Sequence, residues 1–220
     1  MPKWLIYLLI IIVVAVAVYF LIPKKAMAPI PENNSTNSTK NSTANSQTEQ
    51  ASEKSEFANK QAKIKTSMGD ITIEFFAADA PLAVENFIKL AQKDYYNGAT
   101  FHRVVRDFVI QAGDPSGTGA GGESAAGGYF ADELNPSTAS YQAGYKKGVV
   151  AMANKGPNTN SSQFFIMLAD RPLQHNYTIF GRVVSGQDVV DKIGLVITDP
   201  ETDRPITAVT IKKVVIEDKK

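Results

Sequence analysis

The chain has 220 residues, a formal net charge of +1 and no cysteine. Its near-neutral charge points to neither nucleic acid nor an acidic partner. The absence of cysteine excludes disulfides, thiol nucleophiles and cysteine-based zinc sites, and two histidines, His102 and His175, are too few for a histidine-rich metal centre.

Residues 4–22 form an uninterrupted apolar run, WLIYLLIIIVVAVAVYFLI. A helix that spans a bilayer needs about 20 such residues. A cleaved signal peptide is the alternative, with Ala26-Met27-Ala28 as its cleavage site, but the run is longer than the usual apolar core of a signal peptide. We therefore expect an uncleaved transmembrane anchor.

Residues 23–61 are predicted to be a flexible linker, because they are rich in Asn, Ser and Thr and poor in residues that could form a core. Four acceptor patterns for N-glycosylation occur there, at Asn33, Asn34, Asn37 and Asn41. These residue types are also ordinary in linkers, so glycosylation remains open. Anchor and acceptor sites favour one topology: a single-pass protein of the cell membrane with its C-terminal domain outside the cytoplasm.

Residues 62–220 are predicted to be one globular domain. Alternating apolar residues over 64–76 predict strands, and Ser67-Met68-Gly69-Asp70 predicts a hairpin turn between them. Pro81 suits the first turn of a helix. The apolar face of this helix would comprise Leu82, Val84, Phe87, Ile88 and Ala91.

The rest of the domain is mostly strand. Residues 101–111 are rich in β-forming residues, and the glycine-rich stretch 112–128 is predicted to be loop. Residues 147–153, 162–168 and 209–216 predict further strands, and residues 187–193 predict a short helix. Many strands with two helices predict a mainly β barrel or sandwich with helical caps.

Four blocks of sequence resemble the cyclophilin family of peptidyl-prolyl cis/trans isomerases. They read FHRVVRDFVIQAGD at 101–114, GVVAMAN at 148–154, GPNTNSSQFFI at 156–166 and YTIFG at 177–181. They occur in the family's order and near its spacing. The resemblance covers the chain from about Ile64 onward and implies a closed eight-stranded antiparallel β-barrel capped by two α-helices. With the N-terminal segments, it indicates a membrane-anchored, prokaryotic-like cyclophilin.

The implied reaction is rotation about the bond before a proline. The partial double bond of a peptide gives a barrier of about 18–20 kcal/mol, whereas cis and trans X–Pro forms differ by only about 0.5–1 kcal/mol. Catalysis therefore needs no nucleophile, metal or cofactor; it needs a group that stabilises the twisted bond. A guanidinium is always charged and offers fixed donors. The resemblance assigns Arg103 this role, as donor to the proline nitrogen.

The resemblance also assigns the surrounding site. Gln111 matches a residue that contacts substrate and supports the arginine, and Asn154 would hold the peptide by its backbone. Tyr177 stands where many relatives have histidine. The implied substrate-binding positions, in an apolar pocket and along the groove wall, are Phe108, Val109, Gly121, Ala153, Asn154, Phe165, Leu173 and Tyr177. Since successive strand residues alternate in direction, only one of Phe164 and Phe165 need face the groove.

Departures from the family pattern are few. Pro172 stands where drug-sensitive relatives have tryptophan, so we expect weak binding of cyclosporin, the family's inhibitor. Ala112 and Ala120 replace a glycine and a threonine, and both changes are small. The expected partners are therefore proline-containing polypeptides whose folding is assisted outside the membrane by a monomeric domain.

Other interpretations remain beside this one. The groove could belong to a proline-peptide binding or chaperone module with incidental turnover, or the chain could be a structural surface protein. Gly117, Gly119 and Gly122 match a dinucleotide-binding pattern, but no helix-forming residues follow them. His102 is expected to be structural, because the reaction transfers no proton.

Overall fold

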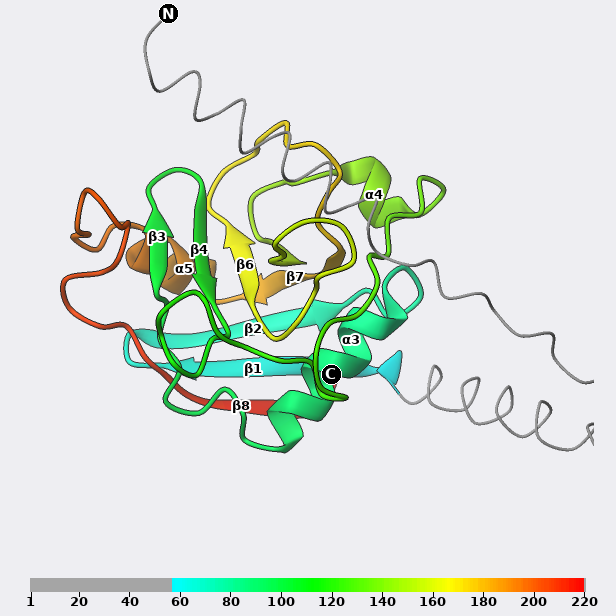
Figure 1. The fold of residues 1–220 in the computed structure, drawn as a ribbon, viewed down its shortest axis with the longest axis horizontal. Coiled ribbons are helices and arrows are strands. Elements are labelled where there is room, and N and C mark those ends of the chain that lie inside the picture. Colours follow the sequence, from blue (N-terminus) through cyan, green and yellow to red (C-terminus); the bar gives the residue numbers. More distant parts are fainter. Residues whose placement is uncertain (1–56, 220) are drawn as a thin grey trace, which may run out of the picture. The chain divides into compact units, whose positions relative to one another are not determined.

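The computed structural model describes residues 57–219 (Figure 1). The predicted anchor at residues 4–22 and the four linker asparagines lie outside the described residues. Among residues 57–219, no helix is long and apolar enough to cross a membrane. The elements are, in chain order, β1 Lys60–Thr66, β2 Gly69–Phe75, α3 Pro81–Gln92, β3 Arg103–Val105, β4 Val109–Ala112, α4 Ala139–Ala143, β5 Val149–Met152, β6 Phe164–Met167, β7 Ile179–Ser185, α5 Gln187–Gly194 and β8 Ile211–Asp218.

The eight strands form one antiparallel sheet in the order β3-β4-β6-β5-β7-β2-β1-β8. The prediction of eight antiparallel strands is confirmed, but the sheet is not a fully closed ladder. Its end strands, β3 and β8, are linked through the residues just before β3: the Phe101 N–H donates to the Val209 carbonyl at 2.9 Å, and Ala99 accepts from the Ile211 N–H at 2.8 Å. The chain turns into β3 only after this contact, so the sheet curls into an incompletely closed barrel.

The predicted hairpin between the first two strands is present. Thr66 pairs with Gly69, leaving Ser67 and Met68 as its loop, and the Thr66 hydroxyl donates to the Gly69 carbonyl at 2.7 Å. Gly69 has φ of 134°, and a Cβ there would lie 2.7 Å from the Val189 side chain. Glycine is therefore required both by the turn and by the close approach of α5.

The helices α3 and α5 pack on the core, as predicted for the two caps. Val84, Phe87, Ile88 and Ala91 of α3 are buried, but Leu82 is 47% exposed, so its assignment to the apolar face was wrong. The reason is a contact with a distant residue: the Leu82 and Ala83 N–H groups donate to the Glu133 carboxylate, which holds the first turn of α3 against the loop that contains Glu133. The short helix α4, which no sequence pattern predicted, has no buried residue.

The packed part of the chain begins before the predicted boundary at residue 62. Phe57 is buried in the main core, and β1 begins at Lys60. The side chain of Lys60 pairs with Asp218 of β8, 2.8 Å away. A boundary placed by composition falls late because the first strand's outward residues, Lys60, Gln61 and Lys63, are polar like the linker.

Candidate active site

Strand register brings the predicted arginine and glutamine side by side. Arg103 on β3 is paired with Gln111 on β4, and Gln111 is paired with Phe165 on β6. Phe165 in turn faces Ala151 on β5. Directly opposed residues of antiparallel strands project from the same face. The sheet thus aligns a cation, an amide and an aromatic ring in one row.

The opposite face of the same strands is core. Val104, Ile110 and Ile166 form the neighbouring row, and all three belong to the main hydrophobic core. Phe164 also lies in that core, whereas Phe165 lies outside it. The two side chains therefore lie on opposite faces of the strand, as alternation along a strand predicts.

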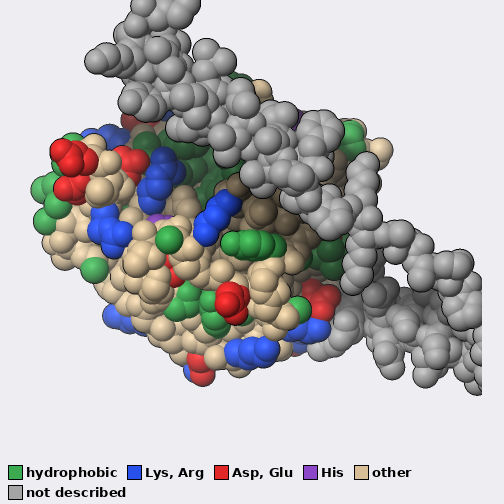
Figure 2. All heavy atoms as spheres, in the orientation of Figure 1, with side chains coloured by type: hydrophobic (Ala, Val, Ile, Leu, Met, Phe, Trp, Pro, Cys, Tyr) green, Lys and Arg blue, Asp and Glu red, His purple; other side chains and the backbone are tan. Residues whose placement is uncertain are grey.

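A second, smaller apolar cluster covers the outward face. Its buried residues are Val109, Tyr145, Val149, Ala151, Phe165, Met167 and Ile179, with Phe76, Phe108, Ala153, Leu173 and Tyr177 partly buried against them. Six of the predicted substrate-binding residues are in this one cluster. The Tyr177 ring meets the Phe165 ring edge-on, with centroids 5.4 Å apart. Figure 2 shows hydrophobic side chains in a hollow over β4 and β6, with basic side chains at its rim.

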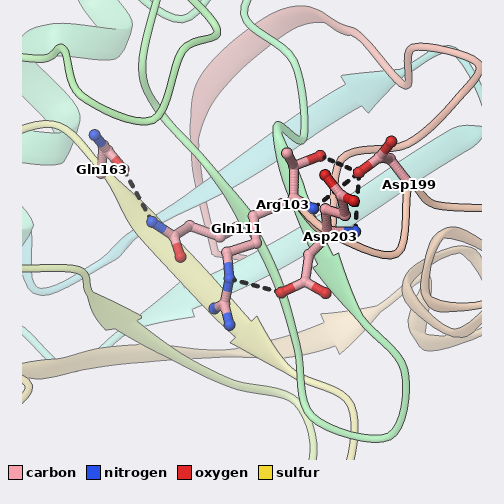
Figure 3. Close-up of polar contacts among 7 residues, drawn as sticks. Arg103, Gln111, Gln163, Asp199 and Asp203 are labelled. Atoms are coloured by element: carbon pink, nitrogen blue, oxygen red, sulfur yellow. Dashed lines mark hydrogen bonds and ion pairs between the residues drawn. The ribbon is translucent and has the colours of Figure 1, made fainter.

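A polar pocket adjoins this cluster through Ala153. Its walls are Gln111, Gly119, Ala153, Asn154, Lys155, Thr159, Ser161 and Gln163. The Gln111 amide donates to Gln163 at 2.9 Å (Figure 3), and the Gln163 amide donates to the carbonyls of Gly119 and Gly121. Gln163 therefore couples the row on the sheet to the glycine-rich loop.

The glycine-rich loop is organised by one buried carboxylate. Asp114 accepts hydrogen bonds from the N–H and hydroxyl of Ser116, the Thr118 hydroxyl, and the N–H groups of Gly119 and Gly121. Burial acts to raise the pKa of Asp114, but the hydrogen bonds from Ser116, Gly121 and Gly119 outweigh burial and hold that pKa well below its usual range. The side chain is therefore ionised at neutral pH.

The predicted Gly121 lies in this loop, although it is Gly119 that lines the polar pocket. A Cβ on Gly121 would approach the Asp114 carboxylate to 2.5 Å, so a side chain there would displace the loop's central acceptor. The loop is followed by no helix before α4, which agrees with setting the dinucleotide pattern aside.

Asn154 is held in place through its side chain and Tyr177 through its backbone. The Asn154 amide donates to the Asn176 carbonyl at 2.7 Å, and its oxygen accepts from the Gly156 N–H. The Tyr145 hydroxyl donates to the Tyr177 carbonyl at 2.8 Å and accepts from the Tyr177 N–H. Burial raises the pKa of Tyr145 to about 12, so this hydroxyl keeps the proton it donates.

Arg103 lies at the end of the row. Its side chain is 38% exposed, and its Nε is 3.3 Å from the Asp203 carboxylate. The adjacent His102 points into the protein: it is buried, and burial lowers the pKa of its imidazole. The ring is therefore uncharged at neutral pH, and neither of its nitrogens has a hydrogen-bond partner among the described residues.

Sequence reasoning missed several residues of the site. Gln163, Gly119, Lys155 and Thr159 line the pocket, and Tyr145 supports the groove edge, although none was assigned a role. Gln163 was accessible to inference, since it directly precedes the two phenylalanines at the start of a buried strand. Asp203 could not be inferred from the sequence, because its partner Arg103 lies 100 positions away in the chain. Within residues 57–219, no three His, Asp or Glu side chains come together as metal ligands.

Known proteins share this fold and about half of its sequence over the matched region. The family model "Cyclophilin type peptidyl-prolyl cis-trans isomerase/CLD" matches residues 61–216. The peptidyl-prolyl cis-trans isomerase CYP18-2 of Arabidopsis thaliana is 46% identical over 159 residues, covering 72% of this chain and 94% of the relative. The isomerase ppi1 of Schizosaccharomyces pombe is 51% identical over 154 residues, covering 70% of this chain and 96% of the relative.

A crystal structure of a cyclophilin-type peptidyl-prolyl cis-trans isomerase from Cryptosporidium parvum is 38% identical, with a TM-score of 0.68, and covers 73% of this chain and 99% of that protein. A second crystal structure of that protein was obtained in the presence of the dipeptide Ala-Pro, with a TM-score of 0.67. The family match includes part or all of each of the eight strands, and it contains the row of Arg103, Gln111 and Phe165. The chain therefore belongs to the cyclophilin-type peptidyl-prolyl cis-trans isomerases.

Proposed function

We propose that this isomerase accelerates X–Pro rotation by donating a hydrogen bond from Arg103 to the proline nitrogen while the apolar cluster holds the proline ring. The observation that carries the proposal is the row of Arg103, Gln111 and Phe165 across three adjacent strands. This row sets a fixed cation beside an apolar surface, which is the combination that a proline and its preceding bond require.

The chemistry follows from the electronic change during rotation. In the planar peptide the nitrogen lone pair is delocalised into the carbonyl, and at the twisted state it becomes available as an acceptor. A donor at Arg103 then interacts more strongly with the twisted state than with either planar isomer. Such differential binding lowers the barrier. Gln111, paired with Arg103 and bonded to Gln163, contacts the peptide on the side of the polar pocket.

The proline ring sits, in this proposal, against Phe108, Val109, Phe165 and Leu173, which share the outward cluster. The substrate residues next to the proline form hydrogen bonds with the Asn154 backbone, and Ala153, Gly121 and Tyr177 form the groove wall. The crystal structure of the Cryptosporidium parvum relative in the presence of Ala-Pro supports this choice of ligand. The substrates are accordingly proline-containing polypeptides, without metal or cofactor.

Cis/trans exchange of an Ala-Pro peptide with the full chain in mild detergent tests the role of Arg103. Arg103→Ala is expected to lower kcat/KM about 100-fold, the usual loss when one transition-state donor is removed. Arg106→Ala is the matched control, because Arg106 is an exposed arginine of the same hairpin, outside the row. Undiminished exchange in Arg103→Ala would remove Arg103 from its role. Retained peptide binding without exchange in the unmutated chain would favour the binding module.

We further propose a single-pass membrane protein, anchored by residues 4–22, with its isomerase domain outside the cytoplasm. The apolar run and the acceptor asparagines Asn33, Asn34, Asn37 and Asn41 support this arrangement. Protease added to intact cells should cleave the domain, and an endoglycosidase should lower its mass. A domain that resists protease until the cells are lysed would contradict this topology. The relatives named above are eukaryotic, so a prokaryotic-like origin remains a prediction.

Weak cyclosporin binding is proposed from Pro172, which is exposed beside the groove residue Leu173. Proline has neither the flat ring nor the N–H of the tryptophan found in drug-sensitive relatives. Pro172→Trp should tighten cyclosporin binding at least about tenfold, the effect of one added hydrogen bond with its buried ring, while Ala-Pro exchange stays unchanged. Equal affinity of both forms would show that another position limits the drug.

A further inference from the structure

We propose that Asp203 is a positioning residue for the isomerase reaction: its carboxylate holds the Nε of Arg103, which leaves the two terminal nitrogens of the guanidinium for the twisting bond. This inference rests on the proposed role of Arg103. Asp203 is outside the four sequence blocks and enters the site from the segment between α5 and β8.

The contact has a defined geometry. Asp203 Oδ2 lies 3.3 Å from Arg103 Nε, and in Figure 3 the terminal nitrogens of the guanidinium point away from Asp203. The side chains are 38% and 41% exposed, so the pair is weak while water reaches it. A peptide bound over Arg103 would exclude water from the Arg103–Asp203 ion pair and so strengthen that pair in the substrate complex.

The backbone of Asp203 is fixed to the same strand as its target. Its carbonyl accepts from the Val104 N–H at 2.8 Å, and its own N–H donates to the Asp199 carbonyl at 2.9 Å. Main-chain and side-chain contacts therefore join Asp203 to two consecutive residues of β3. A shift of this turn would move the guanidinium and the strand together.

The turn itself is tightly bonded. One oxygen of Asp199 accepts from the Glu201 N–H and from the N–H and hydroxyl of Thr202. The hydroxyl of Thr202, followed by these N–H groups, lowers the pKa of Asp199, so this acceptor is an anion at neutral pH. Arg204 then donates to the carbonyls of Gly117 and Thr118, which ties the turn to the glycine-rich loop.

A free arginine side chain samples many rotamers, and the loss of that freedom on ordering opposes catalysis. A carboxylate fixed from the backbone restricts those rotamers before the substrate arrives. The expected gain is modest because the pair is half exposed: removal of the carboxylate should lower kcat/KM about threefold to tenfold.

Backbone geometry offers a simpler reason for an aspartate at this position, and the test must separate the two. Asp203 has φ of 58°, in the left-handed region, where aspartate is tolerated, and Asp94 with φ of 54° is an exposed equivalent on the turn after α3. Asp203→Gly removes the carboxylate and relieves the backbone, so the variant should fold at least as well as the original. Asp94→Gly makes the same change at a turn that lines a separate cavity with Ile88 of α3 and Val214 of β8, a cavity that includes neither Arg103 nor Asp203.

Both glycine variants of the full chain are compared in Ala-Pro exchange and in thermal unfolding. We expect Asp203→Gly to lose kcat with an unchanged KM and an unchanged or raised Tm, and Asp94→Gly to keep its activity. Asp203→Asn, which retains an acceptor, should lose less than Asp203→Gly. Full activity of Asp203→Gly, or a loss confined to KM, would overturn the proposal.

A double-mutant cycle ties the effect to the Nε atom. Arg103→Lys keeps the positive charge but has no Nε, so adding Asp203→Gly to it should change kcat by less than about twofold. An equal loss in both backgrounds would overturn the proposal by showing that Asp203 acts independently of Arg103. The role of Arg103 itself is judged separately, from Arg103→Ala against the unmutated chain.

Discussion

Two neighbouring residues on β6 have opposite tasks. Phe164 is fully buried against Phe87 of α3 and Tyr96, with ring centroids 5.4 and 5.8 Å away, whereas Phe165 belongs to the outward cluster beside Tyr177. One strand therefore contributes alternate residues to the main core and to the outward cluster. Because β6 is buried on both faces, a change on either face of it can be tested separately for its effect on stability and on the proposed activity.

The largest expected effect is on the core side. Phe164→Ala should lower the free energy of unfolding by about 3–5 kcal/mol, because it leaves a cavity between α3 and the sheet. Urea unfolding measures this loss. The folded fraction should still exchange Ala-Pro peptide normally. If folded Phe164→Ala lost its activity, the separation of the two faces would be refuted.

The matching change on the groove side should act on function first. Phe165→Ala is expected to lower kcat/KM about tenfold or more, because it removes apolar area from the proposed proline pocket. Its cost to stability should lie near the lower end of the range for a buried phenylalanine, about 3 kcal/mol, since the surrounding Phe108, Leu173 and Tyr177 are only partly buried and can close over the space. Peptide titration and urea unfolding of the same samples measure both. A stability loss as large as that of Phe164→Ala, with normal catalysis, would count against the pocket.

The glycine-rich loop depends for its stability on one charged side chain, Asp114, whereas the sheet depends on apolar packing. Asp114→Asn should lower the free energy of unfolding by about 1–3 kcal/mol at neutral pH, because the charged acceptor of the loop is lost. The hydrogen bonds hold the folded pKa of Asp114 below the unfolded value of about 3.9, so this stabilisation is complete above that pH and is lost as pH falls below about 4.

Thermal unfolding from neutral pH down to about pH 3 measures this dependence. The Tm of the unmutated chain should exceed that of Asp114→Asn at neutral pH, and this difference should disappear in the acid range. If the two Tm values fell in parallel with pH, the pKa of Asp114 would be the same in the folded and unfolded states. Asp132 offers a control, because this half-buried carboxylate lies outside the glycine-rich loop and its own bonds run to Asn158 and Asn160.

The smallest effect is expected where sheet and loop meet. Gln163→Ala breaks the link from Gln111 to the carbonyls of Gly119 and Gly121, so kcat/KM should fall about threefold while stability changes by about 1 kcal/mol. Ala-Pro exchange and urea unfolding measure the two quantities. A loss as large as that of Arg103→Ala would make Gln163 a direct participant and would change the assignment of roles in the row.

Most strands and both capping helices were predictable because their patterns are local. Alternation over residues 64–76 and the proline at 81 depend only on nearby positions, and β1, β2 and α3 follow them closely. Leu82 was misassigned, since helical periodicity cannot reveal that Glu133, 50 positions away, binds the first turn. The incompletely closed barrel and the start of the packed chain at Phe57 likewise depend on distant partners.

Short contiguous blocks of sequence were enough to predict the family, most of the strands and the two capping helices, because these features depend on neighbouring positions in the chain. Tertiary structure alone decided which residues meet: the register that sets Arg103 against Gln111 and Phe165, the link through Gln163, and the approach of Asp203. These contacts join segments far apart in the chain. Their geometry is set by strand pairing and packing of the whole domain, which no local pattern encodes.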